Sequence, residues 1–178
     1  MAEDRRAQWS KRVIREAYFQ LLDEKDPSSI TVKEVCKKAD VNRSTFYRWY
    51  DGMEGLIGAI GGELLQERFP EGIDILDDVG FLKMVEENQV FYRALFGTLV
   101  RSPTLRSLVA KTFGSCKTLA RSRYGTEGFL AEAQASYLFY GYLEAVHDWV
   151  DAGCPVPPEE LAQALRQVSG RKSSQKPS

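Results

Sequence analysis

The chain has 178 residues, of which 43% are hydrophobic and 28% charged, proportions ordinary for a globular protein of one or two small domains. Its net charge of −1 does not indicate a nucleic-acid partner, but the charge is unevenly distributed. Residues 1–50 hold 11 basic and 8 acidic residues (+3), whereas residues 51–178 hold 13 and 17 (−4). This distribution is typical of a DNA-binding domain followed by a neutral-to-acidic domain. The absence of a secretory leader and of a membrane-length apolar run predicts a cytoplasmic protein.

The first predicted helix begins at Gln8 or Ser10 and ends at Asp23, and residues 1–6 before it are expected to be frayed. Its apolar residues recur with the period of one helix face. Basic residues crowd its beginning, a pattern that suits either attraction to DNA phosphates or a solvated basic end. These residues are Arg5, Arg6, Lys11, Arg12 and Arg15.

Residues 31–50 (TVKEVCKKADVNRSTFYRWY) predict two short helices joined by a tight turn. Thr31 and Glu34 match the capping box, in which each side chain satisfies the other residue's backbone N–H group at a helix start. Asn42 is a favourable N-cap for the second helix. The short separation between the two helical patterns is typical of a helix-turn-helix.

The second of these helices carries side chains suited to DNA. Its first turn holds Arg43, Ser44 and Thr45, and the N-terminal residues of a recognition helix meet base edges in the major groove. Arginine binds guanine bidentately, whereas serine and threonine serve base edges or phosphates. From spacing alone, an ordinary corner of a helical bundle with its charges in solvent is an equal alternative. Further side chains predicted to contact DNA are Lys33, Tyr47, Arg48 and Trp49.

Residues 30–56 (ITVKEVCKKADVNRSTFYRWYDGMEGL) resemble the DNA-binding segment of the TetR family of bacterial regulators. Within the family, their sequence is most similar to the branch that includes dihydroxyacetone-kinase-operon activators. The similarity is strong over about residues 9–65 and elsewhere extends only to the helical layout. It implies that Phe46 and Tyr50 are core residues, and that the positions facing DNA are Lys33, Arg43, Ser44, Thr45, Tyr47 and Trp49.

Two residues depart from the family pattern. Asp40 stands in the turn between the two short helices, where the family usually has a glycine. This difference implies that the connection between the helices is capped differently. Met53 stands where the family usually has a lysine on a phosphate. The loss of one phosphate contact should lower DNA affinity and its salt dependence modestly.

A connecting helix is predicted from Met53 to about Arg68, and it contains four glycines: Gly55, Gly58, Gly61 and Gly62. They suit either a soft helix that lets the body tilt the head or close packing on small residues. The predicted organisation is a DNA-binding domain at 1–52, the connecting helix at 53–68, a regulatory and dimerisation domain at 69–168 and a disordered tail at 169–178.

The body is predicted to be entirely helical, and its longest helix suggests a subunit interface. Residues 137–143 (YLFYGYL), in the middle of that helix, carry no charge, and a helix that is apolar on all sides must be covered on all sides. The predicted interface residues are Leu138, Gly141, Tyr142, Ala145, Leu161 and Leu165. The predicted helices run over about Val79–Glu87, Gln89–Arg101, Ser102–Arg123, Glu127–Ala152 and from Pro157-Pro158 to Val168.

The body is also rich in aromatic residues, most of which should be core. If an effector cavity exists, aromatic side chains would line it, with tyrosine hydroxyls orienting the ligand. The candidates are Phe91, Phe113, Tyr137, Tyr140 and Trp149.

Catalysis is not expected. The single histidine, His147, has no nucleophile beside it, and it and the adjacent Asp148 should point to different faces of a helix, leaving Asp151 as a surface partner. Three widely spaced cysteines (Cys36, Cys116 and Cys154) predict reduced thiols. The sequence therefore predicts no cofactor and no metal.

Together these features predict an all-α protein with an N-terminal three-helix DNA-binding domain and a C-terminal helical bundle. The resemblance implies a ligand-responsive repressor that binds a palindromic operator in double-stranded DNA as a homodimer. The activator branch keeps open an alternative, in which a protein partner rather than a small molecule controls an activator or co-regulator.

Overall fold

The computed structural model describes residues 2–70, 79–99 and 113–169, and within these ranges the chain contains helices and no strand. The prediction of an all-α protein is confirmed. None of the described helices is both long and apolar enough to cross a membrane. The helices are α1 (Ala2–Leu22), α2 (Val32–Lys38), α3 (Arg43–Trp49), α4 (Gly52–Arg68), α5 (Val79–Glu87), α6 (Gln89–Leu99), α8 (Phe113–Tyr124), α9 (Gly128–Asp151) and α10 (Pro158–Ser169), with a short 3-10 helix, η1, at Pro27–Ser29.

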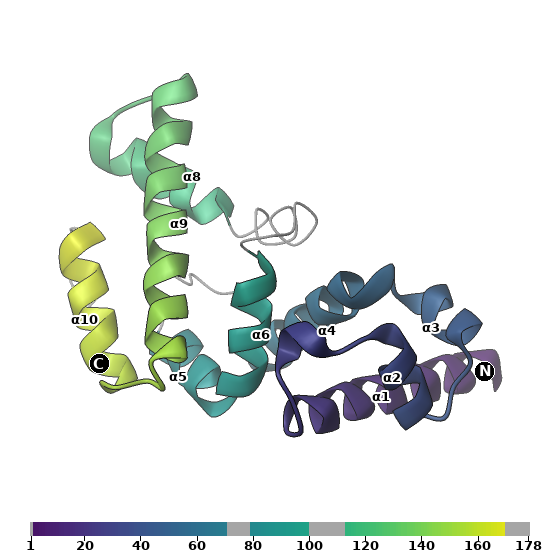
Figure 1. Cartoon of the computed structure of the whole chain (residues 1–178). Helices are drawn as coiled ribbons and strands as arrows, with labels where there is room; N and C mark the ends of the chain where they lie inside the picture. Colours follow the sequence, from purple (N-terminus) through teal and green to yellow (C-terminus); the bar gives the residue numbers. More distant parts are fainter. Residues whose placement is uncertain (1, 71–78, 100–112, 170–178) are drawn as a thin grey trace.

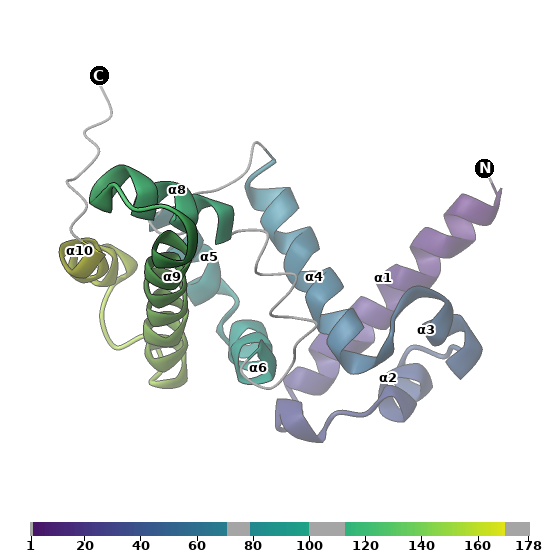
Figure 2. The ribbon, with the colours of Figure 1, turned by 90° about the horizontal axis from the view of Figure 1, so that it is seen from above.

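The helices form a head and a body that meet at α6. Helices α1 to α4 make the head at one end of the molecule, whereas α5, α8, α9 and α10 make the body at the other (Figure 1). Helix α6 lies between them and packs against α1 and α4 on one side and α9 on the other (Figure 2). Helix α4 is therefore not the only link between helices α1–α3 and the body.

Most helix boundaries lie within two residues of those predicted, but the start of the first helix does not. Helix α1 begins at Ala2, so the prediction that residues 2–6 are frayed was wrong. Ser10, one of the two predicted starts, lies inside the helix, where its hydroxyl donates to the carbonyl of Arg6 at 2.8 Å. Because this bond runs back to residue i−4, the serine continues the helix instead of starting it. The predicted helix start at residues 102–103 lies outside the described residues.

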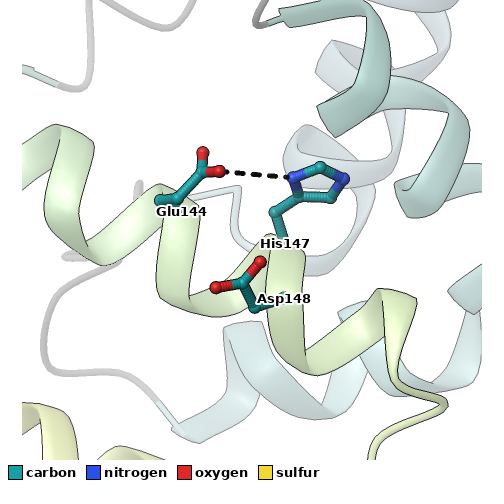
Figure 3. A group of neighbouring side chains, drawn as sticks. All are labelled: Glu144, His147 and Asp148. Carbon is teal, nitrogen blue, oxygen red and sulfur yellow. Dashed lines mark ion pairs between the residues drawn. The ribbon is translucent and has the colours of Figure 1, made fainter.

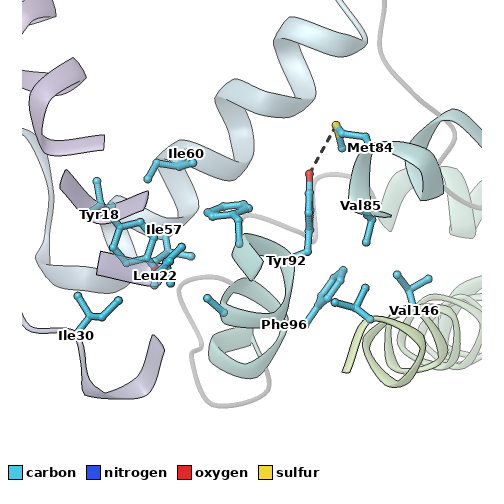
Figure 4. Packing of buried hydrophobic residues seen from close by; sticks show 14 of the residues in the cluster. Tyr18, Leu22, Ile30, Ile57, Ile60, Met84, Val85, Tyr92, Phe96 and Val146 are labelled. Carbon is cyan, nitrogen blue, oxygen red and sulfur yellow. Dashed lines mark hydrogen bonds between the residues drawn. The ribbon is translucent and has the colours of Figure 1, made fainter. Parts of the chain in front are cut away.

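One continuous core joins the head to the body. Tyr18, Phe46 and Leu56 are fully buried in the head. The core continues from the head through α6, where the rings of Phe19 and Phe91 lie 5.7 Å apart, to Val146 on α9 (Figure 4). The predicted burial of Phe46 and Tyr50 is thus confirmed. A shift of α6 would disturb packing in both parts.

One glycine of the connecting helix α4 faces α6. A Cβ atom at Gly61 would lie 3.5 Å from Leu95 and 3.8 Å from Phe91, both on α6, which is ordinary van der Waals contact. At Gly62 a Cβ atom would meet nothing within 4 Å. Packing therefore requires a glycine at neither position, and softening of the helix stays a prediction.

Candidate nucleic-acid interface

The helix-turn-helix begins with the predicted capping box. The Thr31 N–H donates to Glu34 Oε2 at 3.0 Å, and the Glu34 N–H donates to Thr31 Oγ1 at 3.4 Å. Lys25 Nζ also donates to Glu34 Oε1 at 2.6 Å. The bonds from Lys25 and Thr31 lower the pKa of Glu34 to about 2. Since the folded-state pKa is depressed, the carboxylate's contribution to stability is complete above its unfolded-state pKa and is lost as the pH falls toward about 2.

The turn between α2 and α3 places Asp40 in the left-handed region, at a φ of 51°. This explains why a glycine is usual at that position in the family that the sequence resembles, since only glycine adopts such a φ without cost. The backbone N–H of Val41 then donates to the carbonyl of Cys36 at 3.0 Å and closes the turn. Asn42 occupies the N-cap position of α3, as predicted, but its side chain makes no capping hydrogen bond.

We expect Asp40→Gly to raise the free energy of unfolding by roughly 0.5–1 kcal/mol, because it removes the cost of a left-handed L-residue. Asp40→Ala should lower it, because alanine also has a Cβ atom and lacks the short polar side chain that makes this φ tolerable. Urea unfolding followed by circular dichroism measures both. Equal stabilities of the two variants would contradict the assignment of strain to this turn.

Helix α3 presents the predicted DNA-contacting side chains on an open face. Arg43, Ser44, Tyr47 and Arg48 are exposed, and the Tyr47 side chain has 56% of its surface free although it is a large aromatic residue. Phe46, on the opposite side of the helix, is fully buried. Lys33 on α2 is also exposed. In both views α3 lies at the end of the molecule away from the body (Figures 1 and 2).

Two predicted contacts are less accessible than the others. Thr45 is half-buried, and so is Trp49, whose Nε1 atom is buried without a hydrogen-bond partner among the described residues. The ammonium group of Lys11 lies 5.0 Å from the centre of the Trp49 ring, a cation–π contact that joins α1 to α3. The indole therefore supports the orientation of α3 rather than extending freely from it.

The basic residues at the beginning of α1 divide into two groups. Arg5, Arg6 and Lys11 are exposed, and Lys11 contacts the Trp49 ring of α3. In contrast, Arg12 pairs with Glu16 at 3.8 Å, and Arg15 Nη1 lies 3.2 Å from Glu63 and 3.3 Å from Glu67 on α4. The Arg15 pairs join α1 to the connecting helix. The first group is therefore better placed to attract phosphates than Arg12 and Arg15.

The predicted pocket residues differ in their exposure, and their role in ligand binding stays a prediction. Phe91 and Trp149 are buried in the core, and the Trp149 Nε1–H donates to the carbonyl of Val156 at 2.9 Å. Tyr137 and Tyr140 are 78% and 48% exposed. The side chain of Phe113 lies outside the described part of the chain. A separate open cavity of about 500 Å³ lies on α1, and its lining residues are Arg12, Arg15, Glu16, Phe19 and Gln20.

The predicted interface residues also differ in how far they are buried. Gly141 is exposed, and a Cβ atom added there would meet nothing within 4 Å, whereas Tyr142 is buried with its ring 6.5 Å from that of Phe81. The half-buried members are Leu138, Ala145, Leu161 and Leu165. Tyr137 and Tyr140, predicted to line a pocket, accompany Gly141 on the open side of α9. The open face of α9 is thus more aromatic than predicted.

The predicted surroundings of His147 were wrong. Its Nδ1 atom lies 3.9 Å from Glu144, and Asp148 lies in the same cluster (Figure 3). Asp151, the predicted partner, lies 3.5 Å from Arg93 Nε instead. The signal was present in the sequence, because residues three and four apart share a helix face.

Helices α1 to α3 share a buried core and leave one face of the short helix α3 exposed, with its arginines and hydroxyl groups. This arrangement defines a helix-turn-helix DNA-binding domain. The family model described as "Bacterial regulatory proteins, tetR family" matches residues 14–60. The N-terminal part of the chain is therefore a DNA-binding domain of the tetR family, and the resemblance found in the sequence is confirmed.

Solved structures show that the similarity of fold extends beyond the head. The "Dihydroxyacetone kinase operon activator DhaS" has a TM-score of 0.57 and 16% sequence identity over 95% of this chain and 98% of that chain. A proposed transcriptional regulator from Pseudomonas aeruginosa PAO1 has a TM-score of 0.52 and 18% identity over 90% of this chain and 88% of that chain. A search of curated proteins found no match. At these identities the likeness concerns the fold alone.

Proposed function

We propose that this TetR-type regulator binds a palindromic operator as a homodimer and represses transcription until a small-molecule effector releases it. The observation that carries the proposal is the open face of α3, where Arg43 and Tyr47 are exposed while Phe46 holds the helix to the core. Two such helices would enter successive major-groove half-sites, which lie roughly 34–36 Å apart or at multiples of that distance.

The residues of the head have different roles in this proposal. Arg43, in the first turn of α3, recognises a base, because arginine can bind both acceptors of a guanine edge. Tyr47 and Arg48 contact backbone phosphates and set the position of the helix, and Trp49 supports this position through its contact with Lys11 of α1. The residues that assist Arg43 are Lys33, Ser44 and Thr45.

A second mode of control is supported by one observation. The structural neighbour with 16% identity is named as an operon activator. In this alternative, a protein partner controls the chain as an activator or co-regulator.

Selection of bound fragments from random and genomic DNA tests the main proposal. We expect enrichment of an inverted repeat and, at low salt, tight binding of the purified chain. Titration of the resulting complex with metabolites and with candidate protein partners then separates the two modes of control. Failure to enrich any sequence would contradict the proposal, since non-specific attraction alone does not select a site.

We expect Met53→Lys to strengthen operator binding and to steepen its salt dependence. Met53 is half-buried at the beginning of α4, so a lysine can keep the apolar contacts with its stem and place its ammonium group near a phosphate. Each added phosphate contact should increase the slope of log K against log salt by about 0.9. Fluorescence anisotropy at several salt concentrations measures this slope, with Met53→Leu as the uncharged control. An unchanged slope would show that residue 53 does not face the DNA.

A further inference from the structure

Three potential metal ligands gather on one turn of α9, outside the DNA-binding head. One ligand atom each from Glu144, His147 and Asp148 lies within 4.8 Å of the other two (Figure 3). The shortest recorded approach is 3.9 Å, between His147 Nδ1 and Glu144 Oε1. Two metal–ligand bonds of about 2.0–2.2 Å can span such a distance, so an ion fits between these atoms after a small rotation of the glutamate.

The Nδ1 atom of His147 is available as a ligand. It is buried and has no hydrogen-bond partner among the described residues. The imidazole is also held in place, because its ring centre lies 6.1 Å from that of Phe96 on α6 and only 23% of its side chain is exposed. A buried polar atom without a partner carries a desolvation cost that a bound ion would remove.

The two carboxylates of the cluster differ from others on the same helix. Glu132 is paired with Lys117 at 2.9 Å, and Asp151 with Arg93 at 3.5 Å. Within the described part of the chain, no lysine or arginine nitrogen lies within 4.0 Å of Glu144 or Asp148. These two acids are four residues apart on one helix face, where like charges repel. A divalent cation would neutralise both.

The ligand set indicates the class of ion. One imidazole with two carboxylates suits a divalent transition metal such as zinc, cobalt or manganese, whereas magnesium and calcium prefer oxygen ligands alone. Three protein ligands leave at least one coordination position for water or an external ligand. We propose that Glu144, His147 and Asp148 bind one divalent transition-metal ion, independently of the DNA-binding function.

The test uses the full chain, without a histidine tag and freed of metal with a chelator. We expect Zn²⁺ to bind with a stoichiometry of one ion per chain in calorimetric titration and to raise the melting temperature by mass action. Because His147 is the only histidine in the sequence, the imidazole nitrogen signals in an NMR spectrum belong to this residue. The Nδ1 signal should shift on binding. Co²⁺ should bind without a thiolate charge-transfer band, which would otherwise indicate the cysteines.

Variants locate the ion. Glu144→Gln and Asp148→Asn should each weaken Zn²⁺ binding at least about tenfold, a loss that even an outer-shell partner can cause. The matched control is Glu132→Gln, which removes a carboxylate elsewhere on α9 and should leave the affinity unchanged. Circular dichroism melting without metal shows that each variant is folded. The proposal is overturned if the wild-type chain binds no Zn²⁺, if the Nδ1 signal does not move, or if binding survives both substitutions.

Discussion

Replacing both Tyr137 and Tyr140 with glutamate should leave the chain folded but monomeric, and should weaken operator binding at least about a hundredfold. The two side chains are 78% and 48% exposed in the single chain, so they contribute little to its own core. We propose that they lie in the homodimer interface, because they share the open side of α9 with the exposed Gly141. There, two unpaired carboxylates per subunit would lose their hydration without gaining a partner. A monomer binds only one half-site, so it loses the affinity that a dimer gains by binding both half-sites at once.

Analytical ultracentrifugation and fluorescence anisotropy measure these effects. Binding should be compared on a full operator and on DNA with one half-site, since only the full operator distinguishes a dimer from a monomer. Val90→Glu is the matched control, because Val90 is an exposed apolar residue of α6, at 44% exposure, outside the predicted interface. It should change neither assembly nor affinity. A dimeric double variant with unaltered binding would show that subunits associate through another face.

Local sequence signals predicted the head well because its elements depend on neighbouring residues. The capping box needs only Thr31 and Glu34 at the right spacing, and both of its backbone hydrogen bonds are present. The same reasoning was incomplete for Asn42, since a favourable N-cap type does not ensure a capping bond. The unusual residue of the turn, Asp40, was noticed from the family pattern, but its positive φ required the backbone.

The body was predicted less well because its features depend on contacts between distant helices. Apolar composition along residues 137–143 predicts coverage on all sides, but not which side the chain itself covers. The structure buries Phe139 and Tyr142 and leaves Tyr137 and Tyr140 open. Likewise, the burial of Phe91 depends on α1 and α4, which a pattern along α6 does not contain.

The cluster around His147 was missed for a different reason. The adjacency of His147 and Asp148 predicted that their side chains diverge. Glu144, however, lies one helical turn before His147 on the same face. Spacing alone would have suggested the contact with Glu144. That Asp151 pairs with Arg93 of another helix was not accessible from spacing.

Arg43→Ala should weaken operator binding by about 1–3 kcal/mol and relax the sequence preference at one base pair of each half-site. Arg43 begins α3, is exposed and has no acidic partner among the described residues, so its guanidinium is free to meet a base edge. Arg43→Lys keeps the charge but loses the bidentate geometry, and should therefore recover phosphate attraction without restoring the preference.

The contrast with Arg48→Ala separates recognition from general attraction. Arg48 lies in the last turn of α3 and is exposed, and its loss should weaken binding equally across sequences and reduce the salt slope by about 1 per lost contact. Binding of both variants to a library with every single-base change in the operator measures the difference. If Arg43→Ala weakened all sequences equally, Arg43 would be a phosphate contact, and base recognition would have to come from Ser44, Thr45 or Lys33.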